Sequence, residues 1–248
     1  MKRFWVAIGF LTVMPLPAFC RHSEDDLVHS VPFFPFVGLL IGLSTAGITI
    51  LLDNVFSPHV LSVLLVGWLA LIHGGLHLDG LSDTADGFLS PYGRDRVMEI
   101  MRDSRIGVFG CLAIVGILAL KVAAIASLSD ESRIMAVLLA PIAGRCVMVP
   151  MLGFLPSARP DGLGSLFSRR RSSWESVWAV AFMLGAAWLT FRLPGMIAGF
   201  AVIVVLASFA YLCQRRIGGS TGDTFGAASE IAETVVLLAL SAQPFASH

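Results

Sequence analysis

A polar stretch from His77 to Phe88, HLDGLSDTADGF, brings three carboxylates directly after a run of apolar residues. If this stretch is helical, Asp79, Asp83 and Asp86 stand at positions i, i+4 and i+7 and share one face. Carboxylates so arranged repel one another unless a cation lies among them, and all-oxygen ligands suit magnesium or manganese. The alternative is a solvated helix end with Asp and Gly as caps. Three carboxylates on one face favour the metal site.

A second stretch, Glu99–Gly110 (EIMRDSRIGVFG), combines two arginines with one carboxylate. Arg102 and Arg105 flank Asp103, and the planar guanidinium group of arginine matches the oxygens of a phosphate. The same pattern also suits a basic membrane anchor with a local ion pair.

A third stretch, Gly218–Glu233 (GGSTGDTFGAASEIAE), is rich in glycine before an apolar run. Its glycines allow close backbone approach and offer free N–H groups to a phosphate at a helix start, or they form a turn with Thr221 or Asp223 as the N-cap. Glu230 and Glu233 follow at i, i+3. Because carboxylates inside a span are costly, both should face a polar cavity or a cation.

Four further polar residues fall in apolar surroundings: Lys121, Arg145, His73 and His77. We expect Arg145 to form an ion pair between helices or to act at the site. Lys121 suits such a role equally well as snorkelling to the membrane surface. The histidines have a spacing that can bind zinc, but we expect no third zinc-type ligand near them, so packing or hydrogen bonding is expected.

The sequence thus combines carboxylates that suit a divalent metal with arginines and glycines that suit phosphate. This combination indicates phosphoryl transfer, in which metal and arginine neutralise the developing charge. The D-x-x-D-G fragment at residues 83–87 also occurs in phospholipid-type alcohol phosphotransferases, but the Ala-Arg pair that follows the glycine in them is missing here.

The elements that must position these groups are membrane helices. Of 248 residues, 56% are hydrophobic and only 14% charged, whereas soluble domains carry about a quarter charged residues. The formal net charge is zero and the four scattered cysteines form no metal or disulfide pattern. MKR and the apolar run that follows it to Val13 resemble a signal peptide, but the run is short and the bulky Phe19 stands in the cleavage-like sequence LPAFC. We expect an uncleaved interfacial or re-entrant segment instead.

The fold class expected is an all-α polytopic membrane bundle in one domain over residues 1–248, with about seven transmembrane helices. The long polar connections and the N-terminal segment carry thirteen lysines and arginines, whereas the short turns carry two, Arg133 and Arg192. By the positive-inside rule the long connections face the cytoplasm. The predicted spans are Val31–Leu52, Val55–Leu78, Ile106–Leu128, Ile134–Leu155, Ser176–Phe191, Leu193–Cys213 and Gly226–Ala242.

Several stretches resemble characteristic stretches of the cobalamin synthase family. They are GGLHLDGLSDTADGF, MRDSRIGVFG and GGSTGDTFGA, with further likeness in FLTVMPLP, FPFVGLLIG, RPDGLG and the Arg145 region. The resemblance covers essentially the whole chain. It implies the last assembly step of vitamin B12 synthesis in a bacterial inner membrane. There a hydroxyl of α-ribazole or its 5′-phosphate attacks the phosphate attached to cobinamide in adenosylcobinamide-GDP, GMP leaves, and Mg²⁺ is required.

The resemblance also implies roles for single residues. Metal ligands would be Asp79, Asp83, Asp86 and Glu233; catalytic groups would be Asp83, Asp86, Asp103 and Glu230; substrate would be bound by Arg102, Arg105, Arg145, Gly222 and Asp223. Which carboxylate takes the proton stays open. The lipid bilayer is an expected partner, nucleic acid is not, and a homo-oligomer is left open. The alternatives are a CDP-alcohol phosphatidyltransferase-like phospholipid enzyme and a cation-coupled transporter, whose carboxylates would lie near mid-membrane.

Overall fold

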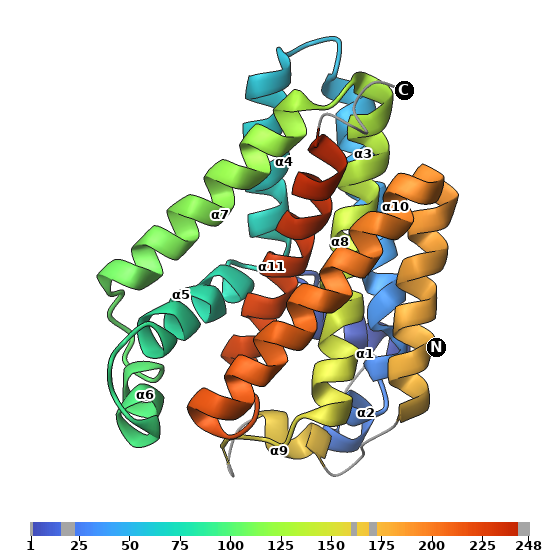
Figure 1. The fold of residues 1–248 in the computed structure, drawn as a ribbon. Coiled ribbons are helices and arrows are strands. Elements are labelled where there is room, and N and C mark those ends of the chain that lie inside the picture. Colours follow the sequence, from blue (N-terminus) through green and yellow to red (C-terminus); the bar gives the residue numbers. More distant parts are fainter. Residues whose placement is uncertain (1, 16–22, 160–162, 169–172, 243–248) are drawn as a thin grey trace.

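A computed structural model describes residues 2–15, 23–159, 163–168 and 173–242, and every regular element in these ranges is helical (Figure 1). The all-α prediction is therefore confirmed. The cleavage-like residues 16–20, residues 160–162 of the RPDGLG stretch and the arginines at 169–171 lie outside the described residues. The helices are α1 (Lys2–Leu11), α2 (Glu24–Val28), η1 (Val31–Phe33), α3 (Phe34–Leu52), α4 (Pro58–Ile72), α5 (Leu76–Phe88), α6 (Arg94–Ile100), α7 (Val108–Ser127), α8 (Asp130–Phe154), α9 (Leu163–Ser168), α10 (Ser173–Ile217) and α11 (Gly222–Ser241).

Within the described residues, five helices are long and apolar enough to cross a membrane, or six if the bent pair α4 and α5 counts as one span. The longest, α10, is broken at Arg192, whose φ of 52° and ψ of −124° are not helical. Figure 1 shows the chain reversing direction there, as expected for the two predicted spans on either side of Arg192. A multi-pass helical membrane protein is confirmed, and the number of seven spans stays a prediction.

The predicted second span, Val55–Leu78, is wrong beyond Ile72. Helix α4 ends at Ile72, and α5 leaves it at an angle of 88°. The turn between them contains Gly74 and Gly75, whose φ values of 62° and 74° lie in the left-handed region that glycine tolerates. The aspartates therefore do not continue the second span. They lie on a separate helix that points away from the axis of α4.

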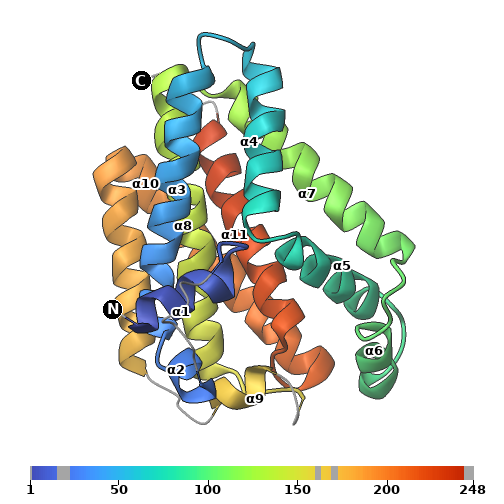
Figure 2. The ribbon, with the colours of Figure 1, turned by 180° about the vertical axis from the view of Figure 1, so that it is seen from behind.

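The N-terminal helix α1 lies across the bundle rather than along it (Figure 2). Val6, Ala7 and Leu11 are buried against the other helices. Beyond the helix, the backbone N–H of Val13 donates to the carbonyl of Ile72, 2.8 Å away. These contacts join the start of the chain to the bend between α4 and α5. Its interfacial or re-entrant placement in a membrane stays a prediction.

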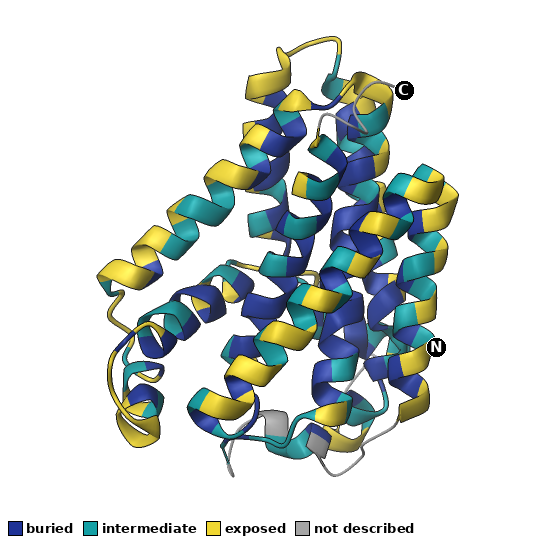
Figure 3. Ribbon diagram, in the orientation of Figure 1, coloured by how far each residue is buried: buried dark blue, intermediate teal, exposed yellow. Residues whose placement is uncertain are grey.

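Helix α8 is the most buried long helix and packs against α3, α10 and α11. The outer faces of α7 and α10 are exposed and apolar, as Figure 3 and the exposed Leu112, Leu189 and Val204 show. A bundle that directs large apolar side chains outward suits a surrounding of lipid.

The connections separate to the two ends of the bundle, as the alternation in loop length predicts (Figure 1). At one end, the short turns are joined by an ion pair from Arg133 Nη1 to Asp53 Oδ1, at 2.6 Å. At the other end lie α6, α9 and the connection from α10 to α11. Here Arg216 Nη2 donates to the carbonyl of Ser90 at 2.6 Å. The polar site is built at this second end.

Candidate active site

Helix α5 carries the three aspartates, so Asp79, Asp83 and Asp86 keep the helical spacing that the sequence predicts. Asp223 from the start of α11 is near enough to repel a charge on Asp83, together with Asp79 and Asp86. All four groups are carboxylates, the ligand type that Mg²⁺ prefers. Within the described residues no three of them bring their oxygens as close together as the ligand atoms of His73, His77 and Glu230 lie.

The start of α7 holds Asp86 in place. The backbone N–H groups of Gly107 and Gly110 donate to its two carboxylate oxygens, at 2.7 and 2.9 Å. A negative charge is favoured there by the helix dipole. A Cβ atom added at either glycine would overlap the Asp86 carboxylate. A side chain at Gly107 or Gly110 would therefore displace the Asp86 carboxylate from this contact.

Helices α5 and α11 approach closely through glycine. A Cβ at Gly80 would lie 2.6 Å from the carbonyl oxygen of Asp223, and one at Gly226 would lie 3.0 Å from the Cα of His77. This packing brings the predicted substrate-binding Asp223 beside the α5 aspartates. Thr221, and not Asp223, is the N-cap of α11.

Arg159 is a site residue that sequence reasoning did not select. Its Nη2 lies 3.1 Å from Asp223 Oδ2 and donates to the carbonyl of Met101 at 3.2 Å. It also offsets the repulsion at Asp83. The only signal for Arg159 in the sequence is its place in the RPDGLG stretch.

The predicted site residues Glu230, Glu233 and Arg145 lie further along α11 and on α8, in a buried ion network. Lys121 Nζ lies 2.6 Å from Glu230 Oε2 and 2.6 Å from Glu233 Oε2, and Arg145 Nη1 pairs with Glu233 Oε1. All four side chains are at most 2% exposed. Lys121 therefore does not snorkel. The metal role of Glu233 stays a prediction, and both of its oxygens already face cations in this structure.

His73 and His77 stack with their ring centroids 4.3 Å apart, and His73 Nε2 lies 3.4 Å from Glu230 Oε1. The expectation that no third ligand is near is therefore wrong, since the fold brings Glu230 to the two histidines. Lys121 occupies the other oxygen of Glu230, however. A dication beside that ammonium group would be repelled. We therefore assign the histidines to the ion network.

The loop after α6 keeps Arg102, Asp103 and Arg105 apart from that network. Asp103 is chelated by Arg105, with Nη2 at 2.6 Å and Nε at 3.0 Å from its oxygens. This pairing lowers the pKa of Asp103 to about 2, so the carboxylate is charged at neutral pH. Arg102 and Arg105 are both exposed. Their predicted contacts to phosphate remain sterically open.

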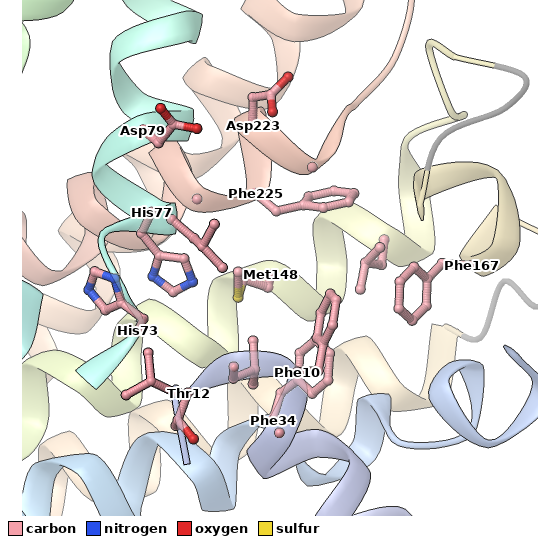
Figure 4. A pocket seen from close by; sticks show the side chains of 17 residues that line it. Phe10, Thr12, Phe34, His73, His77, Asp79, Met148, Phe167, Asp223 and Phe225 are labelled. Atoms are coloured by element: carbon pink, nitrogen blue, oxygen red, sulfur yellow. The ribbon is translucent and has the colours of Figure 1, made fainter. Parts of the chain in front are cut away.

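A cavity of about 250 Å³ opens beside Asp79, the first of the α5 aspartates (Figure 4). Asp79, Asp223, Gly222, His73 and His77 line its polar part. Apolar side chains from α1, α3, α5, α8, α9 and α11 line most of the rest, together with Thr12. Of the predicted site, the structure thus places Asp79, Gly222 and Asp223 around this cavity, with Asp83 and Asp86 further along α5.

Comparison with known proteins matches residues 3–241 to a family model described as cobalamin-5-phosphate synthase. The chain is 38% identical to the adenosylcobinamide-GDP ribazoletransferase of Geotalea daltonii over 98% of both chains. It is 39% identical to that of a Roseiflexus species, over 95% of this chain and 87% of the relative, and 37% identical to that of Klebsiella pneumoniae, over 97% and 99%. No solved structure matches.

Proposed function

Because this chain belongs to the cobalamin-5-phosphate synthase family, we propose that it joins adenosylcobinamide-GDP to α-ribazole or to α-ribazole 5′-phosphate. The structural observation that carries this proposal is the row of three aspartates on α5. One of them is held by the first amides of α7, and a cavity lies beside another.

The reaction replaces a phosphoanhydride bond with a phosphodiester bond. A ribose hydroxyl of the acceptor attacks the phosphorus bound to cobinamide, and a new P–O bond forms. The anhydride bond to GMP breaks, GMP takes the electron pair, and the hydroxyl proton passes to a carboxylate. The product is adenosylcobalamin, or its 5′-phosphate.

In this proposal Asp79, Asp83 and Asp86 hold Mg²⁺, which would neutralise charge on the diphosphate when bound. The oxygen-only donor set and the mutual repulsion of these carboxylates support it. Arg102 and Arg105 would hold phosphate oxygens from the exposed loop. Arg145 is wholly buried against Glu233, so it reaches a phosphate only if that ion pair opens.

We further propose a bacterial inner membrane as the location, with the site facing the cytoplasm. The excess of lysine and arginine on the connections at the site's end of the bundle supports this orientation.

The test is a reconstituted reaction. Purified protein in lipid nanodiscs receives Mg²⁺, adenosylcobinamide-GDP and α-ribazole, and chromatography follows the products. We expect cobalamin and GMP in equal amounts, loss of turnover with EDTA, and recovery when Mg²⁺ is added back. A folded protein that makes no cobalamin would contradict the transferase and favour the phospholipid-type enzyme or the transporter.

Substitutions test the α5 carboxylates in the same assay. Asp83→Asn and Asp86→Asn should each reduce turnover below detection, because a neutral amide is a poor ligand for Mg²⁺. Asp95→Asn, at an exposed position in α6, is the matched control and should keep normal turnover. Near-normal activity in both α5 variants would refute the metal role.

A further inference from the structure

The cavity beside α5 has two chemically different ends. Its polar end carries Asp79 and Asp223, and Figure 4 shows both on the side facing away from Phe10 and Phe34. At the other end, the ring of Phe10 lies 5.9 Å from that of Phe34 and 5.9 Å from that of Phe167. Met148, Leu152 and Phe225 complete this apolar end.

The size of the cavity selects between the two substrates of the proposed reaction. Pockets for drug-sized ligands usually measure about 300–1,000 Å³. A volume of about 250 Å³ therefore suits one nucleoside-sized molecule. A corrinoid that carries a nucleotide is far too large for it.

The chemistry of the apolar end selects between the two aromatic bases. Guanine carries an amide and an amino group, which lose their hydrogen bonds when buried among phenylalanine, methionine and leucine side chains. The benzimidazole of a ribazole has a hydrocarbon edge and can stack on aromatic rings without such a loss. The apolar end thus favours a benzimidazole over a purine.

We propose that this cavity is the acceptor site, with the benzimidazole of α-ribazole against Phe10, Phe34 and Phe167 and its ribose toward Asp79 and Asp223. This inference rests on the proposed function. It directs the attacking hydroxyl toward the α5 carboxylates, and it gives α1 a role, since Phe10 belongs to that helix. Because Phe10 contacts the benzimidazole in this arrangement, it also determines specificity for the base of the acceptor.

Steady-state kinetics of Phe10→Ala test the assignment. The KM for α-ribazole should rise about tenfold, the order expected for the loss of one aromatic packing contact. The KM for adenosylcobinamide-GDP and the kcat should stay within about twofold. Phe10→Leu, which keeps an apolar side chain, should show a smaller rise and guards against a folding defect in the first variant.

Phe4→Ala is the matched control. Phe4 also lies on α1 and also contacts two rings, those of Trp5 and Phe33, but it does not line the cavity. This variant should leave both KM values unchanged. An equal rise in the α-ribazole KM for Phe4→Ala, or no rise for Phe10→Ala, would overturn the assignment.

Equilibrium dialysis of wild-type protein in nanodiscs distinguishes α-ribazole from GMP and lipid as occupants of the cavity. Labelled α-ribazole alone should bind, excess unlabelled α-ribazole should displace it, and GMP should not. Displacement by GMP would assign the cavity to the guanine nucleotide. If α-ribazole does not bind at all, lipid fills the cavity and the proposal is also refuted. If wild-type protein makes no cobalamin, the proposed function itself fails. If it makes cobalamin but lacks this pattern, only the acceptor site fails.

Discussion

Two buried carboxylates, Glu230 and Glu233, share the single ammonium group of Lys121. With Arg145 on Glu233, the network contains two cations and two anions. A buried charge is tolerated only when paired, so each member is needed to keep the others ionised. The network joins α7, α8 and α11, and through His73 it reaches the wall of the cavity.

Removing Lys121 should therefore destabilise the protein strongly. For Lys121→Met we expect a loss of about 3–5 kcal/mol, the cost of leaving buried charge uncompensated. The midpoint of thermal unfolding in detergent measures it. Lys2→Met is the control, because Lys2 also pairs with a carboxylate, Asp26 at 2.7 Å, but 48% of its side chain is exposed. Exposed pairs contribute about 0–1 kcal/mol.

The double variant Lys121→Met with Glu230→Gln removes one charge of each sign. It should be more stable than Lys121→Met alone, because fewer carboxylates remain without a partner. If Lys121→Met unfolds at the wild-type temperature, the network does not stabilise the fold.

At the scale of elements, the start of α7 determines how Asp86 is presented. Gly110→Ala should displace the carboxylate, because the added Cβ overlaps Asp86 and Ser82. We expect turnover to fall at least about tenfold, as for other losses of orientation at a metal ligand. The reconstituted assay measures it.

Gly116→Ala provides the comparison on the same helix, since a Cβ there meets nothing within 4 Å. It should retain full activity. Equal activity of the Gly110 and Gly116 variants would show that the position of Asp86 does not depend on α7.

The bend between α4 and α5 depends on backbone conformation. Gly75 has a φ of 74° with open space around its Cβ position, so Gly75→Ala adds backbone strain without a clash. We expect a loss of about 1–2 kcal/mol in the free energy of unfolding. Gly67→Ala, also in open space but inside α4, should be at least as stable as wild type, because alanine favours a helix over glycine. Unchanged stability of both variants would argue that the bend adjusts freely.

The whole molecule is a bundle with two different ends, and we predict that the site's end faces the cytoplasm. The test uses single cysteines in a cysteine-free background. Ser104→Cys in the loop before α7 and Asn54→Cys between α3 and α4 are both exposed positions. A membrane-impermeant maleimide should label Ser104→Cys only in inside-out vesicles and Asn54→Cys only in right-side-out vesicles. The reverse pattern would show that the site's end faces away from the cytoplasm. Labelling of both cysteines from one side would contradict the two-ended arrangement.

Local patterns determined much of this protein. The spacing of Asp79, Asp83 and Asp86 depends only on helical periodicity, and the structure keeps it. The apolar runs specify most of the long helices, because a span is a property of consecutive residues. The loops lie at two ends of the bundle for the same reason. Each span crosses the membrane once, so successive connections fall at opposite ends.

Tertiary structure alone decided the partners. Asp86 meets amides 21 and 24 residues away, and Lys121 meets carboxylates 109 and 112 residues away. The bend that ends α4 at Ile72 changes the direction of the aspartate helix, and the ring-lined cavity is assembled from six helices. Periodicity says which side of a helix a residue lies on. It does not say which helix packs there, because packing depends on the shapes of surfaces that are distant in the chain.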